Sequence, residues 1–241
     1  MDIYWLEQTE SDAPTGNQWL GAKETLCLSS LRFAKRRADW RLGRWTAKQA
    51  VAACLNLPTD LHALADIEIH AASSGAPEVF IQNQPANLAI SLSHRDGTAL
   101  CAVAPAGTSV GCDLETIEPR SDAFVADYFT AAEKALIAQT PGEKQPLLVA
   151  LLWSGKESAL KALRVGLRLD TRSICVSPAH TWPQSAAKKW QDLGPTPLVT
   201  SPDDWRPLRV RYSGGHAFAG WWRFQDHLVR TYVSDLPLRT P

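Results

Sequence analysis

Hydrophobic positions in the first part of the chain change from a strand-like to a helical spacing. Residues 1–28 mix short apolar pairs with turn residues, which predicts an edge strand followed by a loop. From Ser29 or Ser30 to Leu57 the spacing is helical, and Pro58 supplies a stop signal. We therefore expect one long helix to follow the first strand.

Strand-like alternation dominates the part of the chain after this helix. Turn residues, such as the pair Asp96-Gly97, separate the alternating segments from one another. The expected strands are 66–70, 77–81, 88–93, 100–104 and 109–115. Together these segments predict a small sheet.

Helical and strand-like patterns alternate again in the second half. A capping box at 130–133 predicts a helix that ends near Pro141, and a second helix covers about 145–163. The remaining expected strands are 168–177, 208–212, 217–224 and 231–233, with a poorly patterned, proline-rich stretch at 178–204. This order of elements predicts an α+β fold with two comparable halves, which we divide into residues 1–108 and 109–241.

Composition and charge restrict the function classes. The 241 residues are 45% hydrophobic and 21% charged, which is typical of a globular protein with a packed core. Lys plus Arg equals Asp plus Glu at 25 each, so we expect no bulk attraction to nucleic acid or to anionic membranes. The five cysteines show no C-x-x-C pair, which indicates neither a disulfide framework nor a zinc site. No apolar run approaches the length of a membrane span, and we expect a cytoplasmic protein.

Two acids, Asp113 and Glu115, lie two residues apart in an expected strand and therefore point to the same face. Paired carboxylates repel each other unless a cation or a proton lies between them. Magnesium prefers oxygen ligands and keeps waters and substrate phosphates in its shell, so the pair is a candidate magnesium site. The alternative interpretation is a solvated strand edge with two unrelated acids.

A second candidate group lies on one stripe of the helix expected at 145–163. Trp153, Glu157 and Lys161 are spaced i, i+4 and i+8. They combine an aromatic wall, a potential metal ligand or base, and a cation for phosphate. The alternative is an ordinary Glu-to-Lys helix pair, which contributes about 0.2–0.5 kcal/mol, next to a core tryptophan.

Basic residues are concentrated on one face of the first long helix. Arg37, Arg41, Arg44 and Lys48 are spaced i, i+4, i+7 and i+11, so an anion or several acids are needed to offset their repulsion. A local basic cluster in a neutral protein is better suited to a small polyanion than to a DNA duplex. The alternative is a solvated helix face.

Four short motifs follow one another along the chain. They are K-R-R-A-D-W-R-L-G-R at 35–44, S-L-S-H at 91–94, V-G-C-D at 110–113 and W-S-G-K-E-S-A-L-K at 153–161. In order and spacing they resemble the motifs of the Sfp-type 4′-phosphopantetheinyl transferases, over about residues 30–165. The resemblance implies two similar α/β halves related by a pseudo-twofold axis, with the active site in the cleft between them.

The resemblance also implies roles for individual residues. Glu157 and Lys161 correspond to the catalytic positions, and His94 corresponds to the residue that meets the 3′-phosphate of coenzyme A. The expected metal ligands are Asp113, Glu115 and Glu157. The residues expected to bind coenzyme A or to support its site are Arg37, Arg44, Lys48, Ser93, His94, Trp153, Lys156 and Lys161.

The activity implied by the resemblance is transfer of the 4′-phosphopantetheine moiety of coenzyme A to a serine of an apo carrier protein, with release of adenosine 3′,5′-bisphosphate. Mg²⁺ is the expected cofactor and the carrier the expected partner, and we expect a monomer. The sequence departs from the family pattern at Cys112, where an aliphatic residue is usual, and at Ala76, where some members have a lysine.

Two other functions stay open at this point. A magnesium-dependent nuclease is the nearest different chemistry, because an Asp-x-Glu pair and a later Glu and Lys resemble acidic nuclease sites. The helical spacing of the Glu and Lys and the neutral net charge disfavour it. A non-catalytic coenzyme A-binding or scaffold protein would keep the fold, but it has no need of acids that repel each other.

Overall fold

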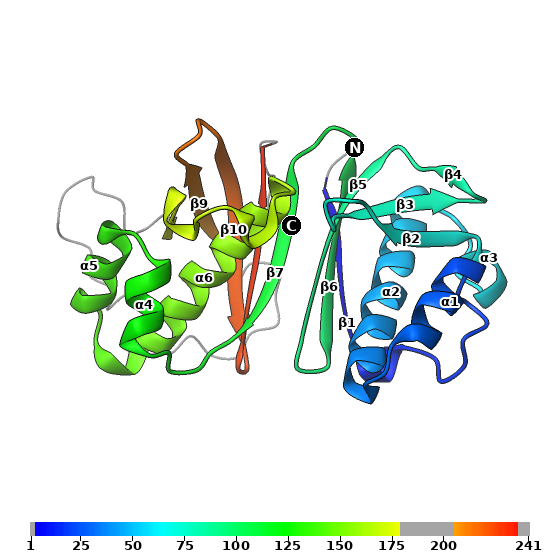
Figure 1. Ribbon diagram of the computed structural model, residues 1–241, viewed down its shortest axis with the longest axis horizontal. Helices are drawn as coiled ribbons and strands as arrows, with labels where there is room; N and C mark the ends of the chain where they lie inside the picture. The colour runs from blue at the N-terminus through cyan, green and yellow to red at the C-terminus, as the bar shows by residue number, and fades with distance from the viewer. Residues whose placement is uncertain (1–2, 179–204, 236–241) are drawn as a thin grey trace.

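The computed structural model describes residues 3–178 and 205–235, which form two lobes side by side (Figure 1). Both lobes contain helices packed against antiparallel sheet, so the expected α+β fold is confirmed. In the described part of the chain, no helix is long and apolar enough to cross a membrane. Apart from its first residue, the stretch at 178–204 lies outside the described residues.

The first lobe is built around a long helix that packs on a three-stranded sheet. Its elements are β1 (Tyr4–Thr9), α1 (Ala22–Ser30), α2 (Ala34–Leu55), α3 (Leu61–Ala65), β2 (Ile67–Ala71), β3 (Pro77–Ile81), β4 (Gln84–Pro85), β5 (Leu88–Arg95) and β6 (Thr98–Pro105). One antiparallel sheet has the order β1-β6-β5, and a smaller one has the order β2-β3-β4. The long helix α2 covers the first sheet, and its residues Trp45 and Val51 belong to the core of this lobe.

The second lobe has one larger sheet and again a long helix across it. Its elements are β7 (Val110–Thr116), α4 (Asp122–Tyr128), α5 (Ala131–Gln139), α6 (Gln145–Ala162), β8 (Ile174–Pro178), β9 (Arg206–Tyr212), β10 (Ala217–Gln225) and β11 (Leu228–Ser234). The sheet is antiparallel in the order β7-β11-β10-β9-β8, and α6 packs on β7 and β11. Short 3-10 helices complete the chain: η1 (Glu10–Asp12), η2 (Gly142–Lys144), η3 (Gly166–Arg168) and η4 (Thr171–Ser173).

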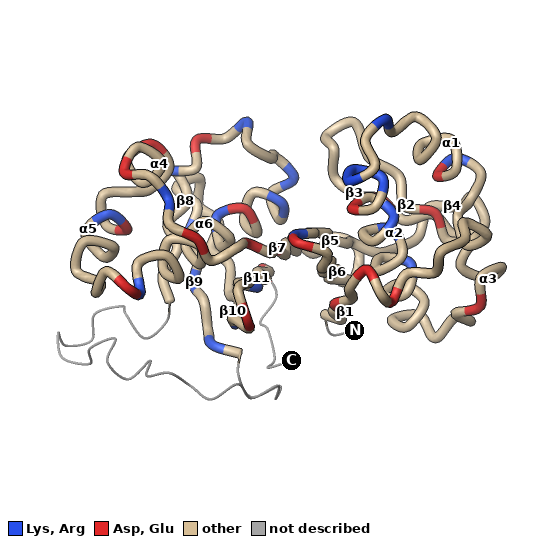
Figure 2. Tube along the Cα trace, turned by 90° about the horizontal axis from the view of Figure 1, so that it is seen from below, with Lys and Arg blue, Asp and Glu red and all other residues tan. Residues whose placement is uncertain are grey.

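Strands β5 and β7 join the lobes through serine side chains, in the middle of the molecule (Figure 2). Ser91 Oγ accepts a hydrogen bond from the Cys112 amide at 2.9 Å, and Ser93 Oγ accepts one from the Leu114 amide at 3.1 Å. Cys112 and Leu114 also belong to an apolar cluster with Tyr232 that contains residues of both lobes. The S-L-S-H segment therefore fixes β7 against the first lobe.

Each lobe contains a buried lysine–glutamate pair in the same structural setting. Lys48 of α2 pairs with Glu24 of α1 at 2.5 Å, and Glu24 also accepts the Ile69 amide of β2. Lys156 of α6 pairs with Glu133 of α5 at 2.9 Å, and Glu133 accepts an amide of β8. Each glutamate is the third residue of its helix and bonds back to the amide of the N-cap residue. This repetition supports the expectation of two similar halves.

The helix expected from residue 29 or 30 to Leu57 is α2, which begins only at Ala34, whereas α1 lies mostly in residues that were expected to form a loop. Ser29 and Ser30 donate their hydroxyls to carbonyls of the preceding turn, so they end α1 instead of capping a new helix. Extended backbone at 31–33 then separates α1 from α2.

Short elements account for the other differences. The helices α3 and α4 span less than two full turns each, which is too short to produce a helical pattern in the sequence. The strand expected at 168–177 begins only at Ile174, because η3 and η4 occupy its first part. The strand expected at 77–81 is confirmed with its bounds, and the other expected strands are confirmed with shifted ends.

Candidate active site

Gly111 brings α6 into direct contact with β7. A Cβ atom at this position would lie 1.8 Å from the Ser158 carbonyl oxygen, so only glycine allows the helix to approach the strand this closely. Cys112 and Leu114 point to the apolar cluster between the lobes, so Asp113, which lies between them, points toward α6. The V-G-C-D motif of β7 and the W-S-G-K-E-S-A-L-K motif of α6 are therefore packed against each other.

Asp113 is a buried acid whose two oxygens have different surroundings. Its Oδ1 accepts hydrogen bonds from Lys161 Nζ and from Ser93 Oγ, both at 2.8 Å. Its Oδ2 is also buried, and no described residue donates a hydrogen bond to it. Lys161 donates a further bond to the Cys112 carbonyl at 3.0 Å. A buried carboxylate oxygen without a donor is a position that a cation can fill.

Glu157 lies one turn before Lys161 on α6, but Lys161 pairs with Asp113 instead. Burial and the nearby Asp113 raise the pKa of Glu157 from 4.5 to about 7. Burial lowers the pKa of Lys161, but Asp113 and neighbouring groups outweigh it, and the pKa is raised overall. The Glu157–Lys161 helix pair is therefore not formed. Asp113 and Glu157 repel each other, and only one lysine, Lys161, lies near both.

Glu115, the third expected metal ligand, is bound by two arginines. Its Oε1 accepts Arg120 at 2.9 Å and Arg95 at 3.0 Å. Within residues 3–178 and 205–235, no three His, Cys, Asp or Glu side chains converge as a ligand group. The free oxygen of Asp113 and the carboxylate of Glu157 nevertheless fit Mg²⁺, because this ion commonly uses one or two protein carboxylates together with waters and substrate phosphates.

His94 lies beside one particular face of α2. A Cβ atom on Gly43 would be 4.0 Å from the His94 ring, and the Lys35–Asp39 ion pair, at 2.8 Å, is on the same helix face. Burial lowers the pKa of His94. Of the nearby charges, Asp39 raises this pKa and Lys161 lowers it. His94 therefore lies between α2 and the lysine of the candidate site. Lys35 was not among the expected site residues, although its i, i+4, i+8 spacing with Asp39 and Gly43 was a signal.

Three cations expected around His94, namely Arg37, Arg44 and Lys48, are on a different face of α2. Lys48 is fully buried in its glutamate pair, and its Nζ also donates to two carbonyls, so its expected role in phosphate binding is wrong. Arg44 packs over the Trp40 ring at 4.9 Å. Arg37 is exposed and lines a separate cavity of the first lobe. The structure does not bring these three side chains together with His94.

Trp153 and Lys156 hold α6 in place, and the structure does not direct them into the site. Trp153 packs edge to face against Phe124 and Tyr128 of α4, with centroid separations of 5.0 and 5.2 Å. Lys156 is fully buried against Glu133 and bonds to carbonyls of the η4 region. Its three donors are used inside the core, so Lys156 supports the site by holding α6 and offers no free donor to coenzyme A.

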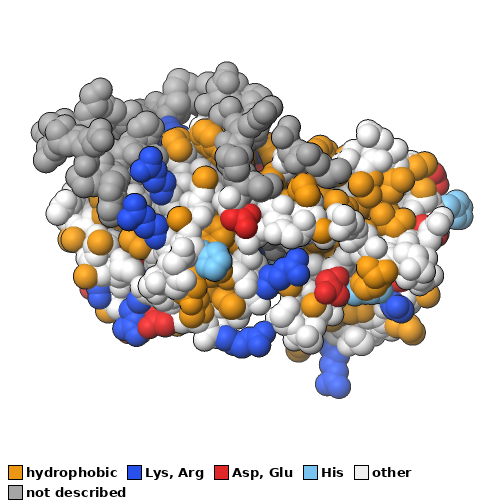
Figure 3. Space-filling view, turned by 90° about the horizontal axis from the view of Figure 1, so that it is seen from above, with side chains coloured by type: hydrophobic (Ala, Val, Ile, Leu, Met, Phe, Trp, Pro, Cys, Tyr) orange, Lys and Arg blue, Asp and Glu red, His pale blue; other side chains and the backbone are white. Residues whose placement is uncertain are grey.

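A cavity of about 230 Å³ lies between the lobes beside the end of α6. Residues 74–77 and 90–92 line it from the first lobe, and Lys161 and Arg164 line it from the second. The space-filling view shows the surface hollowed between the two lobes, with basic side chains nearby (Figure 3). Arg168 of η3 donates to the Ser74 carbonyl at 3.0 Å and so links the lobes at this cavity. Arg164, three residues beyond Lys161, was not among the expected site residues.

Comparison with known proteins assigns the family. The family model described as the 4′-phosphopantetheinyl transferase superfamily matches residues 109–231, which is just over half of the chain. The chain therefore belongs to the 4′-phosphopantetheinyl transferase superfamily. No curated protein matches it.

Among the solved structures that this chain resembles, at low overall similarity, are holo-(acyl-carrier-protein) synthases. The Bacillus anthracis protein, solved in complex with CoA (3′,5′-ADP), is 18% identical, and the match covers 42% of this chain and 92% of that one, with a TM-score of 0.36. The Helicobacter pylori protein, solved in complex with coenzyme A, is 16% identical, with coverages of 43% and 99% and a TM-score of 0.35.

Proposed function

We propose that the protein is a magnesium-dependent, Sfp-type transferase that moves the 4′-phosphopantetheine moiety of coenzyme A to a serine of an apo carrier protein. The meeting of Asp113, Glu157 and Lys161 where the lobes join carries the proposal. Phosphoryl transfer is catalysed mainly by positioning and by charge stabilisation, and these three groups are suited to both. The presence of two similar lobes in one chain supports the Sfp type over the shorter holo-carrier synthases.

The free oxygen of Asp113 and the carboxylate of Glu157 would hold Mg²⁺, with Glu115 as a third candidate. When bound, the ion neutralises charge on the diphosphate and orients the scissile bond. Ser93 and Lys161 both bind the other oxygen of Asp113, so they fix the direction in which its free oxygen points. We therefore assign Ser93 a positioning role.

Lys161 and Glu157 would manage charge and protons during transfer. Its acidic neighbours keep Lys161 protonated, so its ammonium can offset negative charge on the departing adenosine 3′,5′-bisphosphate. Glu157, close to Asp113 and Lys161, would accept the proton of the attacking serine directly or through a water. The serine oxygen would bond to the phosphorus that carries pantetheine as the bond to the nucleotide phosphate breaks.

The cavity between the lobes would hold the nucleotide part of coenzyme A. Small side chains and backbone at 74–77 form one wall, and Lys161 and Arg164 place positive charge on the other. Arg164 would supply a cation in place of the lysine that some family members have at the position of Ala76. His94 and Lys35 lie where α2 faces the site and would bind the 3′-phosphate.

An assay with apo carrier proteins tests the proposal. The full chain is incubated with coenzyme A, Mg²⁺ and a panel of apo carriers from fatty acid, polyketide and peptide synthesis, and the carriers are read by intact mass. We expect at least one carrier to gain one phosphopantetheine group at its serine, and omission of Mg²⁺ to stop the gain. Tight coenzyme A binding without transfer to any carrier would contradict the proposal and favour a scaffold. The carrier, the monomeric state, the cytoplasmic location and the division into residues 1–108 and 109–241 stay predictions.

A further inference from the structure

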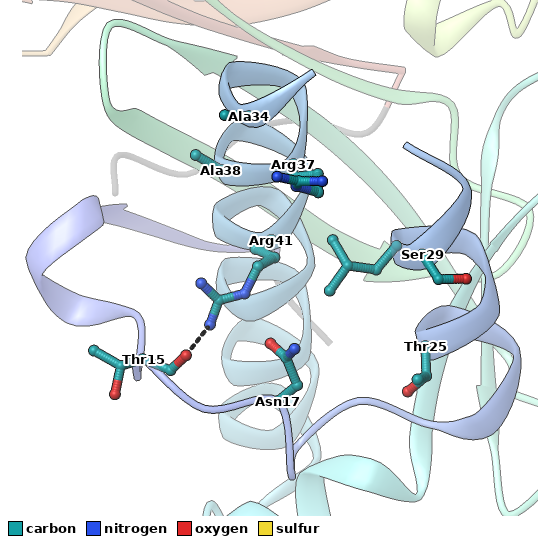
Figure 4. A pocket seen from close by; sticks show the side chains of 9 residues that line it. Thr15, Asn17, Thr25, Ser29, Ala34, Arg37, Ala38 and Arg41 are labelled. Carbon is teal, nitrogen blue, oxygen red and sulfur yellow. Dashed lines mark hydrogen bonds between the residues drawn. The ribbon is translucent and has the colours of Figure 1, made fainter. Parts of the chain in front are cut away.

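A second cavity lies in the first lobe, between α1, the first turns of α2 and the loop at 15–17 (Figure 4). Its volume is about 490 Å³. Arg37 and Arg41, one helical turn apart on α2, both line it. Arg37 follows Lys35 by two residues, and an α-helix turns about 100° per residue, so Arg37 lies about 200° around α2 from Lys35. The face of Lys35 is the one beside His94, so the two arginines face another way. The cavity is therefore separate from the one between the lobes.

The two arginines bring positive charge that no described acid neutralises. Arg41 Nη2 donates only to the carbonyls of residues 14, 15 and 16, at 2.6, 3.2 and 3.0 Å. Arg37 makes a single long bond, 3.4 Å, to the Leu31 carbonyl. Two other cations of α2, Lys35 and Lys48, have carboxylate partners. Like charges one turn apart repel, so an anion bound between the two guanidinium groups would be stabilised.

The remaining lining favours an organic anion over a simple inorganic one. Thr25 Oγ1 donates to the Gly21 carbonyl and Ser29 Oγ to the Leu26 carbonyl, so both hydroxyl protons are used and their lone pairs are left to accept. Leu28 and the alanines of α2 add an apolar surface. The volume is also larger than inorganic phosphate fills. A ligand with a phosphate group would bind the two arginines, and hydroxyl groups on the same ligand would donate to Thr25 Oγ1 and Ser29 Oγ.

We infer that this cavity binds a small phosphorylated compound that carries hydroxyl groups, such as a sugar phosphate. The phosphate lies between the guanidinium groups of Arg37 and Arg41, and hydroxyl groups of the ligand donate to Thr25 and Ser29. This site does not depend on the proposed transfer activity, because none of its lining residues contacts Asp113, Glu157 or Lys161.

Calorimetric titration of the full chain with ribose 5-phosphate tests the inference. We expect saturable binding, weaker binding of inorganic phosphate and none of neutral ribose. Arg37→Gln should lower the affinity for ribose 5-phosphate about tenfold, since a charge-assisted pair is lost. Arg36→Gln is the matched control, because Arg36 is exposed on the same helix and does not line the cavity. Its affinity should stay within about twofold of the wild type.

A second titration in saturating coenzyme A separates the two cavities. The affinity for ribose 5-phosphate should not change when coenzyme A is present. Competition by coenzyme A would overturn the inference, because the cavity would then be part of the coenzyme A site. Equal affinity for inorganic phosphate, equal loss in Arg36→Gln, or no binding of ribose 5-phosphate at millimolar concentration would overturn it as well.

Discussion

Lys161 donates to Asp113 at 2.8 Å and forms no ion pair with Glu157, which precedes it by one turn on the same helix. The cation of the helix therefore binds the acid of the strand. Glu157 is left beside Asp113 with its pKa raised to about 7. The site has more acids than the lysine can neutralise, which is unfavourable for the fold and favourable for a bound cation.

Glu157→Gln should stabilise the metal-free protein at neutral and alkaline pH. The pKa of Glu157 is about 7 in the folded chain and 4.5 as the ordinary value, so the folded state binds more protons between these two pH values. Stability contributed by the protonated form is therefore lost as pH rises from about 4.5 to about 7. Because the side chain is partly exposed, we expect a gain of about 1–2 kcal/mol for the variant at pH 8. Urea unfolding at pH 5 and pH 8 with a chelator measures it; an equal difference at both pH values would contradict the raised pKa.

Lys161→Gln should lower kcat for transfer by about 100-fold or more, since it removes a charge aimed at the leaving group. The KM for coenzyme A should change much less, because the cavity between the lobes keeps its other contacts. Steady-state kinetics with one apo carrier provide the measurement. Lys144→Gln, in η2, is the control and should behave as the wild type. A rise in KM alone would assign Lys161 to binding only.

Gly111→Ala should displace α6 from β7. The added Cβ would meet the Ser158 carbonyl oxygen at 1.8 Å, and a backbone atom within a packed helix has little freedom to move. We expect a loss of at least about 3 kcal/mol in the free energy of unfolding, together with loss of transfer. Gly142→Ala is the matched control, because nothing lies within 4 Å of its added Cβ, and its effect should stay within about 0.5 kcal/mol. Similar stabilities of the two variants in urea would show that the contact is not tight.

The buried pair of the first lobe should matter for stability as a unit. Lys48→Met alone leaves Glu24 charged and buried, which we expect to cost about 3–5 kcal/mol. The double variant Glu24→Gln/Lys48→Met should recover part of this loss, because no uncompensated charge remains. Urea unfolding of both variants is the measurement. A double variant that is less stable than Lys48→Met alone would contradict this account.

The meeting of Asp113 with the α6 motif was expected from the family resemblance, and the period-two and period-3.6 patterns added only which face of each element carries the side chain. The same reasoning failed for Lys48 and Lys156. A helical pattern treats lysine as solvent-facing, whereas each of these lysines has a capping glutamate more than twenty residues earlier that makes burial possible. Of the two glutamates, only Glu133 was recognised in the sequence, as part of a capping box, and a capping box does not show which distant lysine packs against it.

The basic face of α2 shows a second limit of sequence reasoning. The spacing of Arg37 and Arg41 correctly placed them on one face, but it could not show which element this face meets. That depends on α1 (Ala22–Ser30), which was not expected, because residues up to 28 were assigned to a strand and a loop. In the structure Arg37 and Arg41 face α1, whereas Lys35 and Gly43 lie on the face of α2 beside His94.

Binding of Mn²⁺ in the presence of coenzyme A, measured by electron paramagnetic resonance, tests the central claim most directly. We expect one ion to bind to the wild type, and Asp113→Asn and Glu157→Gln each to weaken it about tenfold or more, with Glu143→Gln as an unaffected control. Binding that persists unchanged in both Asp113→Asn and Glu157→Gln would show that these two carboxylates do not hold the ion.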